Sequence, residues 1–350
     1  MPVLKPEALI DERVVALRRA HEEARLPRAE LDLSGGIDSA VMAGLLVLAL
    51  GPDNIILAHT KMNTDGDQTR RAEVLAKALG CRLAVGHFTG SYNVVLEELI
   101  RSLVEAGYNN RDGITASCMA DPTILGSLRS TLRAPLGRAY NRLTGGGIRH
   151  GTGNEDEDRY LRFYQKGGDG EVDSNPIAFL SKGETYQLAL ALGKRLRAEA
   201  AFLPIIRAVP SPDLWGNGDA HTDEAELQKW LGVPFTYSRI DLETGKYRYV
   251  GTIERVARFL DYTTTLIPSG LQGPQVLFDD AEPYWDLTVT LAKESGYFNE
   301  YKRSEVEAFL MAARRAERAT RHKLNPNIPT YGNRAALVED GILTNDLPNV

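Results

Sequence analysis

Glycines, hydroxyls and one carboxylate crowd into a six-residue stretch near the start of the chain, Ser34-Gly35-Gly36-Ile37-Asp38-Ser39. Paired glycines let the backbone take positive φ and approach a ligand closely. The N–H groups of such a turn bind anions, and the positive end of a following helix adds to this attraction. Asp38 would repel phosphate unless a cation lay between them, so it is predicted to be a magnesium ligand. The loop is not a Walker P-loop, because the lysine of that motif is missing. The alternative is an ordinary Gly-Gly turn capped by Ser or Asp.

A second polar turn, Gly151-Thr152-Gly153-Asn154, follows a short predicted strand and leads into four consecutive acids, residues 155–158. Acids at the start of a helix can simply offset the helix dipole, and this explanation suits most of them. One of the four is placed to share a metal ion with Asp38, and we assign that role to Glu157.

A third polar segment, residues 165–176, is rich in glycine and aspartate and contains Lys166 and Asp173. It suits a polar ligand with hydroxyl groups, and the alternative is a solvated surface turn. Lys182 follows at the start of a predicted helix. A cation there opposes the helix dipole, which favours a ligand contact over a purely structural role.

Alternating short strands and helices must position these segments. The expected elements are a helix at 7–26, a strand at 29–33, a helix at 39–50, a strand at 54–59, a helix at 67–79, a strand at 82–88, helices at 92–106 and 122–142 (with a kink or restart at Pro135), a strand at 148–151, and helices at 156–164 and 182–197. This alternation predicts an α/β fold with a doubly wound, Rossmann-like parallel sheet, covered by helices on both faces. In such sheets ligands bind beyond the carboxyl ends of the strands, where both glycine turns are expected.

The pattern loosens after about residue 207. Helices are expected near 224–231, 252–261, 283–294 and 304–321, followed by an extended tail. We therefore predict three parts: a leading helix at 1–28, an α/β core at 29–207, and a mainly helical extension at 208–350 that completes the substrate site.

Composition narrows the class of protein. The net charge of −6 gives no general affinity for nucleic acid. Two cysteines without metal-ligand spacing are typical of a reduced, cytoplasmic protein. The first residues are unlike a signal peptide, and the longest apolar run, residues 40–50, is too short to cross a membrane.

In this order, the polar segments resemble the NAD synthetase family of N-type ATP pyrophosphatases. The matching segments are Ser34–Ser39, Leu132-Arg133-Ala134-Pro135, Gly151–Glu157, Lys166–Asp173, Pro176–Lys182, Pro210–Trp215, Thr222–Leu227 and Arg321-His322-Lys323. The resemblance covers residues 29 to 335, although the arginine segment fits only with a one-residue gap and Ser211 stands where the family has threonine.

The resemblance also implies site residues. ATP contacts would come from Ser34, Gly35, Gly36, Ile37, Asp38, Ser39, Thr152, Lys182 and Ser211. Contacts with deamido-NAD would come from Arg133, Lys166, Asp173, His322 and Lys323. Magnesium would be held by Asp38 and Glu157, and catalysis would be carried by these two acids with Lys182 and Asp173.

The implied reaction is amidation of deamido-NAD to NAD through an acyl-adenylate, with ammonia as nucleophile and AMP and pyrophosphate as products. Only about 28 residues precede the first strand, so we expect no amidase domain, and ammonia comes free or from a separate glutamine amidase. The family also implies a homodimer. The alternatives are a related ligase that adenylates a different acid or tRNA, and a nucleotide-binding regulator without activity.

Overall fold

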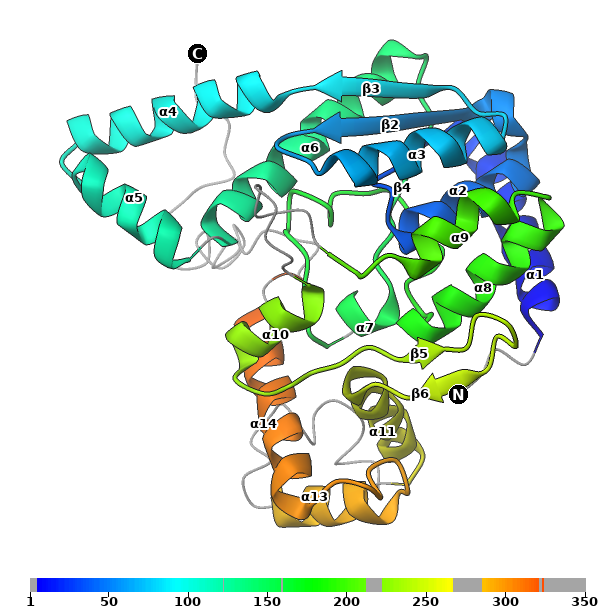
Figure 1. Ribbon diagram of the computed structural model, residues 1–350, viewed down its shortest axis with the longest axis vertical. Coiled ribbons are helices and arrows are strands. Elements are labelled where there is room, and N and C mark those ends of the chain that lie inside the picture. Colours follow the sequence, from blue (N-terminus) through cyan, green and yellow to red (C-terminus); the bar gives the residue numbers. More distant parts are fainter. Residues whose placement is uncertain are drawn as a thin grey trace, which may run out of the picture.

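A four-stranded parallel sheet forms the centre of the N-terminal part of the protein, seen here in a computed structural model that describes residues 5–121, 123–158, 160–211, 222–266, 285–320 and 323 (Figure 1). Its strands are β1 (Ala29–Asp32), β2 (Ile55–Lys61), β3 (Leu83–His87) and β4 (Ile148–His150), in the order β3-β2-β1-β4. The chain builds outward from β1 to β3 and then returns to place β4 on the other side of β1. This reversal of strand order creates the crevice in which α/β proteins bind ligands.

Helices cover both faces of the sheet. They are α1 (Pro6–Ala24), α2 (Ile37–Leu50), α3 (Gly66–Ala78), α4 (Thr89–Glu105), α5 (Arg111–Ala120), α6 (Thr123–Leu143), α7 (Glu155–Asp158), α8 (Lys182–Arg195) and α9 (Glu199–Arg207), with the short 3-10 turn η1 (Pro52–Asn54). Leu31 and Leu57 join α1, α2, α3, α8 and α9 in one hydrophobic cluster, while α6 packs on the opposite face. The predicted doubly wound α/β fold is therefore confirmed.

The C-terminal part is mainly helical, as predicted. It contains α10 (Asp223–Leu231), the two-stranded hairpin of β5 (Arg239–Ile240) and β6 (Tyr247–Tyr249), α11 (Thr252–Leu266), α13 (Trp285–Glu294) and α14 (Arg303–Thr320). These helices share a second hydrophobic cluster around Phe235, Phe259 and Phe309, which also takes in Tyr160 and Leu161. The boundaries proposed at residues 28 and 207 stay a prediction. In the described part of the chain, no helix has both the length and the apolar character to cross a membrane.

Several local predictions were wrong or incomplete. The helix expected at 156–164 ends at Asp158, because the next residues turn into the second cluster and Arg162 takes a left-handed φ of 48°. Helix α6 continues through Pro135 as one element, so the helix does not restart there, and the kink stays a prediction. Helices α5 and α9 and the β5–β6 hairpin were not anticipated. The tail after Lys323 lies outside the described residues.

Candidate active site

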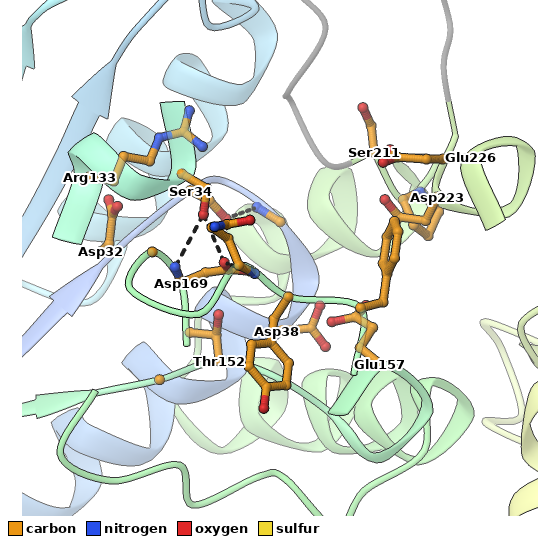
Figure 2. A pocket seen from close by; sticks show the side chains of 18 of the residues that line it. Asp32, Ser34, Asp38, Arg133, Thr152, Glu157, Asp169, Ser211, Asp223 and Glu226 are labelled. Atoms are coloured by element: carbon orange, nitrogen blue, oxygen red, sulfur yellow. Dashed lines mark hydrogen bonds between the residues drawn. The ribbon is translucent and has the colours of Figure 1, made fainter. Parts of the chain in front are cut away.

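A cavity of about 1040 Å³ lies at the carboxyl ends of β1 and β4. Its walls come from the loops after these strands, from α6, from the 162–172 segment, and from the start of α10. Figure 2 shows Arg133 and Asp32 at one end, Ser211 and Asp223 at the other, and Asp38 between them. The cavity thus lies where the parallel sheet predicted a ligand.

The loop after β1 is shaped for a close approach to a ligand. Gly35 has a φ of +85°, and a Cβ there would lie 2.3 Å from the carbonyl oxygen of Gln68, so only glycine fits. The Ser34 and Ser39 hydroxyls lie 3.0 Å apart, and the Gly36 N–H donates to Ser34 Oγ at 3.2 Å. Ser34, Gly36 and Ile37 line the cavity, whereas buried Ser39 braces the loop from behind by donating to the Gly36 carbonyl.

Lys182 joins the two acids that the sequence analysis paired. Its Nζ lies 2.8 Å from Asp38 Oδ2 and 2.7 Å from Glu157 Oε1. The lysine side chain is 2% exposed, whereas the carboxylates are 17% and 19% exposed. Asn154 donates its side-chain N–H to Asp38 Oδ1 at 3.0 Å, and all three charged residues line the cavity. The structure thus brings together residues that are more than a hundred positions apart in the chain.

Burial and charge set the ionisation of this group. Burial by itself would lower the pKa of Lys182, but Asp38 and Glu157 raise it well above its usual value. Burial raises the pKa of Glu157, and Lys182 opposes that rise. Burial also raises the pKa of neighbouring Asp223 to about 8. A permanently protonated lysine therefore faces an excess of acidic groups, a setting that favours an additional cation.

Two residues at this site were not among the predicted ones. Tyr237 donates its hydroxyl to Glu157 Oε1 at 3.4 Å, and Lys182 Nζ lies 5.1 Å from the centre of its ring. Asp223 starts α10 and lines the cavity. The Thr-Asp-Glu segment around Asp223 is one of the segments that resemble the family, but no motif marks Tyr237.

The other acids of α7 serve the local structure. The Lys182 N–H donates to Asp156 Oδ2 at 3.0 Å, and Asp156 is fully buried. The Asn175 side chain donates to Asp158 Oδ2 at 3.0 Å. A Cβ on Gly153 would lie 2.0 Å from that same oxygen, so the glycine makes room for the Asp158 carboxyl. The choice of Glu157 as the acid facing Asp38 therefore agrees with the geometry.

The remaining predicted residues divide into two groups. Thr152, Arg133, Ser211 and Lys323 line the cavity, and Lys323 donates to the carbonyl of Arg162 at 2.8 Å. Lys166 and Asp173 are not among the described residues that line the cavity. His322 lies outside the described residues.

Asp169 contributes to the cavity in place of Asp173. Its Oδ1 accepts hydrogen bonds from Ser130 Oγ and from the Gln165 N–H, both at 2.8 Å, and the residue lines the cavity (Figure 2). Asp173 instead accepts from the Arg149 N–H at 2.9 Å and from Arg138 Nη1 at 2.8 Å. The sequence could not separate these two acids, because both belong to the same glycine-rich segment.

Comparison with known proteins matches this chain to one family. A family model described as NAD synthase matches residues 9–243. The NH(3)-dependent NAD(+) synthetase of Archaeoglobus fulgidus is 30% identical over 240 residues, which are 66% of this chain and 82% of that protein. The corresponding protein of Methanococcoides burtonii is 32% identical over 216 residues, which are 61% and 69% of the two chains.

Solved structures show the same fold. The NMN synthetase from Francisella tularensis gives a TM-score of 0.59 at 19% identity, covering 93% of this chain and 98% of that one. A glutamine-dependent NAD(+) synthetase from Cytophaga hutchinsonii gives a TM-score of 0.60 at 13% identity, covering 93% of this chain and 50% of that one. Both likenesses extend beyond the sheet into the C-terminal helices.

Proposed function

Because the chain belongs to the NAD synthase family, which consists of ligases, we propose that it amidates deamido-NAD to NAD with ATP and ammonia. The observation that carries this proposal is the meeting of Asp38, Glu157 and Lys182 beside the glycine loop, at the open end of the sheet. This arrangement supplies anion-binding amides, a buried ammonium and two oxygen ligands in one cavity.

Two displacements account for the reaction. First, the nicotinate carboxylate oxygen attacks the α phosphorus of ATP, and the bond to the bridging oxygen breaks so that pyrophosphate leaves. Next, the nitrogen of ammonia attacks the acyl carbon, AMP leaves, and the nitrogen loses a proton to a base. Both partners of the first step are anions, so the site must neutralise charge.

The loop and Lys182 would perform that neutralisation. The amides around Gly36 and the N-terminus of α2 would offer their positive ends to a bound phosphate. Ser34 and Thr152 add hydroxyl donors from the two strands that flank the crevice. Lys182 supplies a full positive charge that is already desolvated, which makes it more effective than a charge in water.

Asp38 and Glu157 also suit magnesium. No group of three or more His, Cys, Asp or Glu residues in the described part of the chain forms a ready metal site. Magnesium, however, typically takes one or two carboxylates and completes its shell with phosphate oxygens and water. When bound it would polarise the phosphates and offset their charge. The ion would then depend on the nucleotide, with Asp38 and Glu157 as its protein ligands.

The far end of the cavity would hold deamido-NAD. Arg133 on α6 lies at one end of the cavity (Figure 2), and Lys323 adds a second cation to the cavity wall. By family resemblance, His322 and Lys166 stay predicted contacts with deamido-NAD, and Ser211 stays a predicted contact with ATP. For the proton released by ammonia we propose Asp169, since its carboxyl lines the cavity. Asp173 would then act indirectly, by holding Arg149 and Arg138.

A second copy of the chain is the proposed partner. Helices α4 and α5 project from the sheet (Figure 1) and carry exposed apolar side chains. These include Val94, Val95, Leu99, Leu103 and Met119. Exposed apolar residues clustered on one pair of helices are typical of an interaction surface.

Light scattering tests this surface. The molar mass should be that of a dimer for the wild type and that of a monomer for Leu99→Asp. A mass that is the same for both proteins would remove this surface from the proposal.

We also propose a cytoplasmic enzyme without a nucleic-acid partner, fed by free ammonia or by a separate glutamine amidase. The net charge of −6 and the free thiols Cys81 and Cys118 support this setting.

The test is an assay with ATP, magnesium and deamido-NAD, supplied with either ammonium or glutamine. We expect NAD, AMP and pyrophosphate with ammonium only. Pyrophosphate release with a different nucleotide carboxylic acid, but not with deamido-NAD, would favour the related ligase. ATP binding without turnover of any acid would favour the regulator.

A further inference from the structure

One arginine of the C-terminal region reaches the two short segments that carry the lysine and glutamate of the site. Arg258 on α11 places Nη2 2.9 Å from Glu155 Oε2 and 3.5 Å from Glu184 Oε2. Its Nε lies 4.0 Å from Glu254 Oε1, one turn earlier on the same helix. All four side chains are mostly buried, with exposed fractions between 0% and 19%. Charges removed from water in this way are costly to separate.

The glutamates that Arg258 joins lie at the starts of two helices. Glu155 begins α7, two residues before Glu157. Glu184 lies in the first turn of α8 and forms a capping box with Ser181, in which the Ser181 N–H donates to Glu184 Oε2 at 2.9 Å. Lys182 is the first residue of that helix. A single guanidinium therefore fixes both helix starts relative to each other.

A backbone contact couples the same two segments. The N–H of Lys182 donates to Asp156 Oδ2, so a shift of α7 also moves the lysine. The 2.7 Å contact between Lys182 Nζ and Glu157 depends on this coupling. Misplacing a catalytic group by about 1 Å can cost about 100-fold in rate.

We propose that Arg258 is a positioning residue that holds Lys182 and Glu157 at the spacing needed for the phosphates of ATP. This inference rests on the proposed function. It gives α11, which lies beyond the residues matched by the family, a part in the reaction.

Arg258→Ala tests it, with Arg255→Ala as the matched control. Arg255 is on the same helix, but it donates to Val250 and pairs with Glu300, away from α7 and α8. For Arg258→Ala we expect about a 10- to 100-fold loss in kcat and in ATP affinity, while KM for deamido-NAD stays within about twofold. Arg255→Ala should keep all three values near those of the wild type.

Chemical rescue separates positioning from damage to the fold. Millimolar guanidinium should restore part of the kcat of Arg258→Ala, measured below the unfolding transition, and should not help Arg255→Ala. Wild-type kcat and ATP affinity in Arg258→Ala, or an equal loss in Arg255→Ala, would overturn the proposal. If the wild type makes no NAD, the proposed function fails, and calorimetric ATP binding by the same variants still decides the role of Arg258.

Discussion

Two buried ionic clusters lie close to the same sheet and differ in how their charges balance. On the α6 face, Arg149 Nη1 donates to both oxygens of Glu30, at 2.7 and 2.6 Å, and the carboxylate is 0% exposed. At the cavity, the ammonium of Lys182 faces the carboxyl groups of Asp38 and Glu157, which remain partly exposed. The first cluster, Arg149 with Glu30, pairs one cation with one carboxyl group, and we call it the closed cluster. The second, Lys182 with Asp38 and Glu157, pairs one cation with two carboxyl groups, and we call it the open cluster.

This difference separates a structural pair from a binding site. A buried pair of one guanidinium and one carboxyl group has no surplus negative charge to hold a further cation. A cluster with an extra carboxylate that is open on one side would, under the proposed function, attract a cation and through it the phosphates of a nucleotide. Contacts between a cation and a carboxyl group therefore have different roles in the two clusters. The role depends on the ratio of acidic to basic groups and on whether the carboxyl groups are exposed.

Replacing an acid of the open cluster should have the largest effect. Asp38→Ala removes a proposed magnesium ligand and leaves Lys182 paired with Glu157 alone. We expect NAD formation to fall by about 1000-fold or more, with a nearly unchanged fold. NAD release with ammonium, together with circular dichroism, measures both. The control is Asp67→Asn, a mostly exposed acid on α3 that should keep full activity. Equal turnover in Asp38→Ala and wild type would remove the metal assignment.

Breaking the closed cluster should affect stability instead. Glu30→Leu leaves the guanidinium of Arg149 buried without its partner, and we expect the free energy of unfolding to fall by about 3–5 kcal/mol. Urea denaturation gives this value. The double variant Glu30→Leu with Arg149→Met removes both charges and should recover most of the loss. If the double variant is no more stable than the single one, the pair contributes little as an ion pair.

The sequence was most informative where a local rule fixes the position of a residue. Glycine turns after apolar strands predicted the cavity, because the carboxyl ends of parallel strands share one edge of the sheet. Tyr237 could not be found this way, since tertiary packing brings it to Glu157 from the loop before β5, a segment without a motif. Helix 156–164 was overestimated for a similar reason, because Tyr160 and Leu161 are drawn into the second cluster. Local pattern could not separate Asp169 from Asp173, four residues apart in one loop.

Comparing Asp169 with Asp173 sharpens the boundary between the site and its support. Asp169→Asn should lower kcat with ammonium by about 100-fold if its carboxylate takes the proton from the nucleophile. Asp173→Asn should change kcat by much less, because this exposed acid holds Arg138 and the backbone of Arg149. Steady-state rates at saturating ammonium decide between them. The reverse order of effects would favour Asp173 as the base, the acid of this segment that the family resemblance places in catalysis.

The smallest effect concerns the acid next to Glu157. Burial raises the pKa of Asp158 to about 8, so this carboxyl is protonated at neutral pH, whereas the unfolded chain ionises it near 3.8. Its contribution to stability is therefore complete below the unfolded value and is lost as pH rises through about 8. Between about pH 6 and pH 8 we expect the wild type to lose about 2 kcal/mol through this group.

Asp158→Asn mimics the protonated carboxyl and should remove that part of the pH dependence while NAD formation stays near the wild-type rate. Denaturation curves of both proteins across this pH range give the difference directly. If the free energy of unfolding changes with pH in the same way for both proteins, Asp158 is already ionised in the folded state. The acidic surplus of the open cluster would then extend beyond Asp38 and Glu157 to a third carboxylate, and the contrast with the closed cluster would grow.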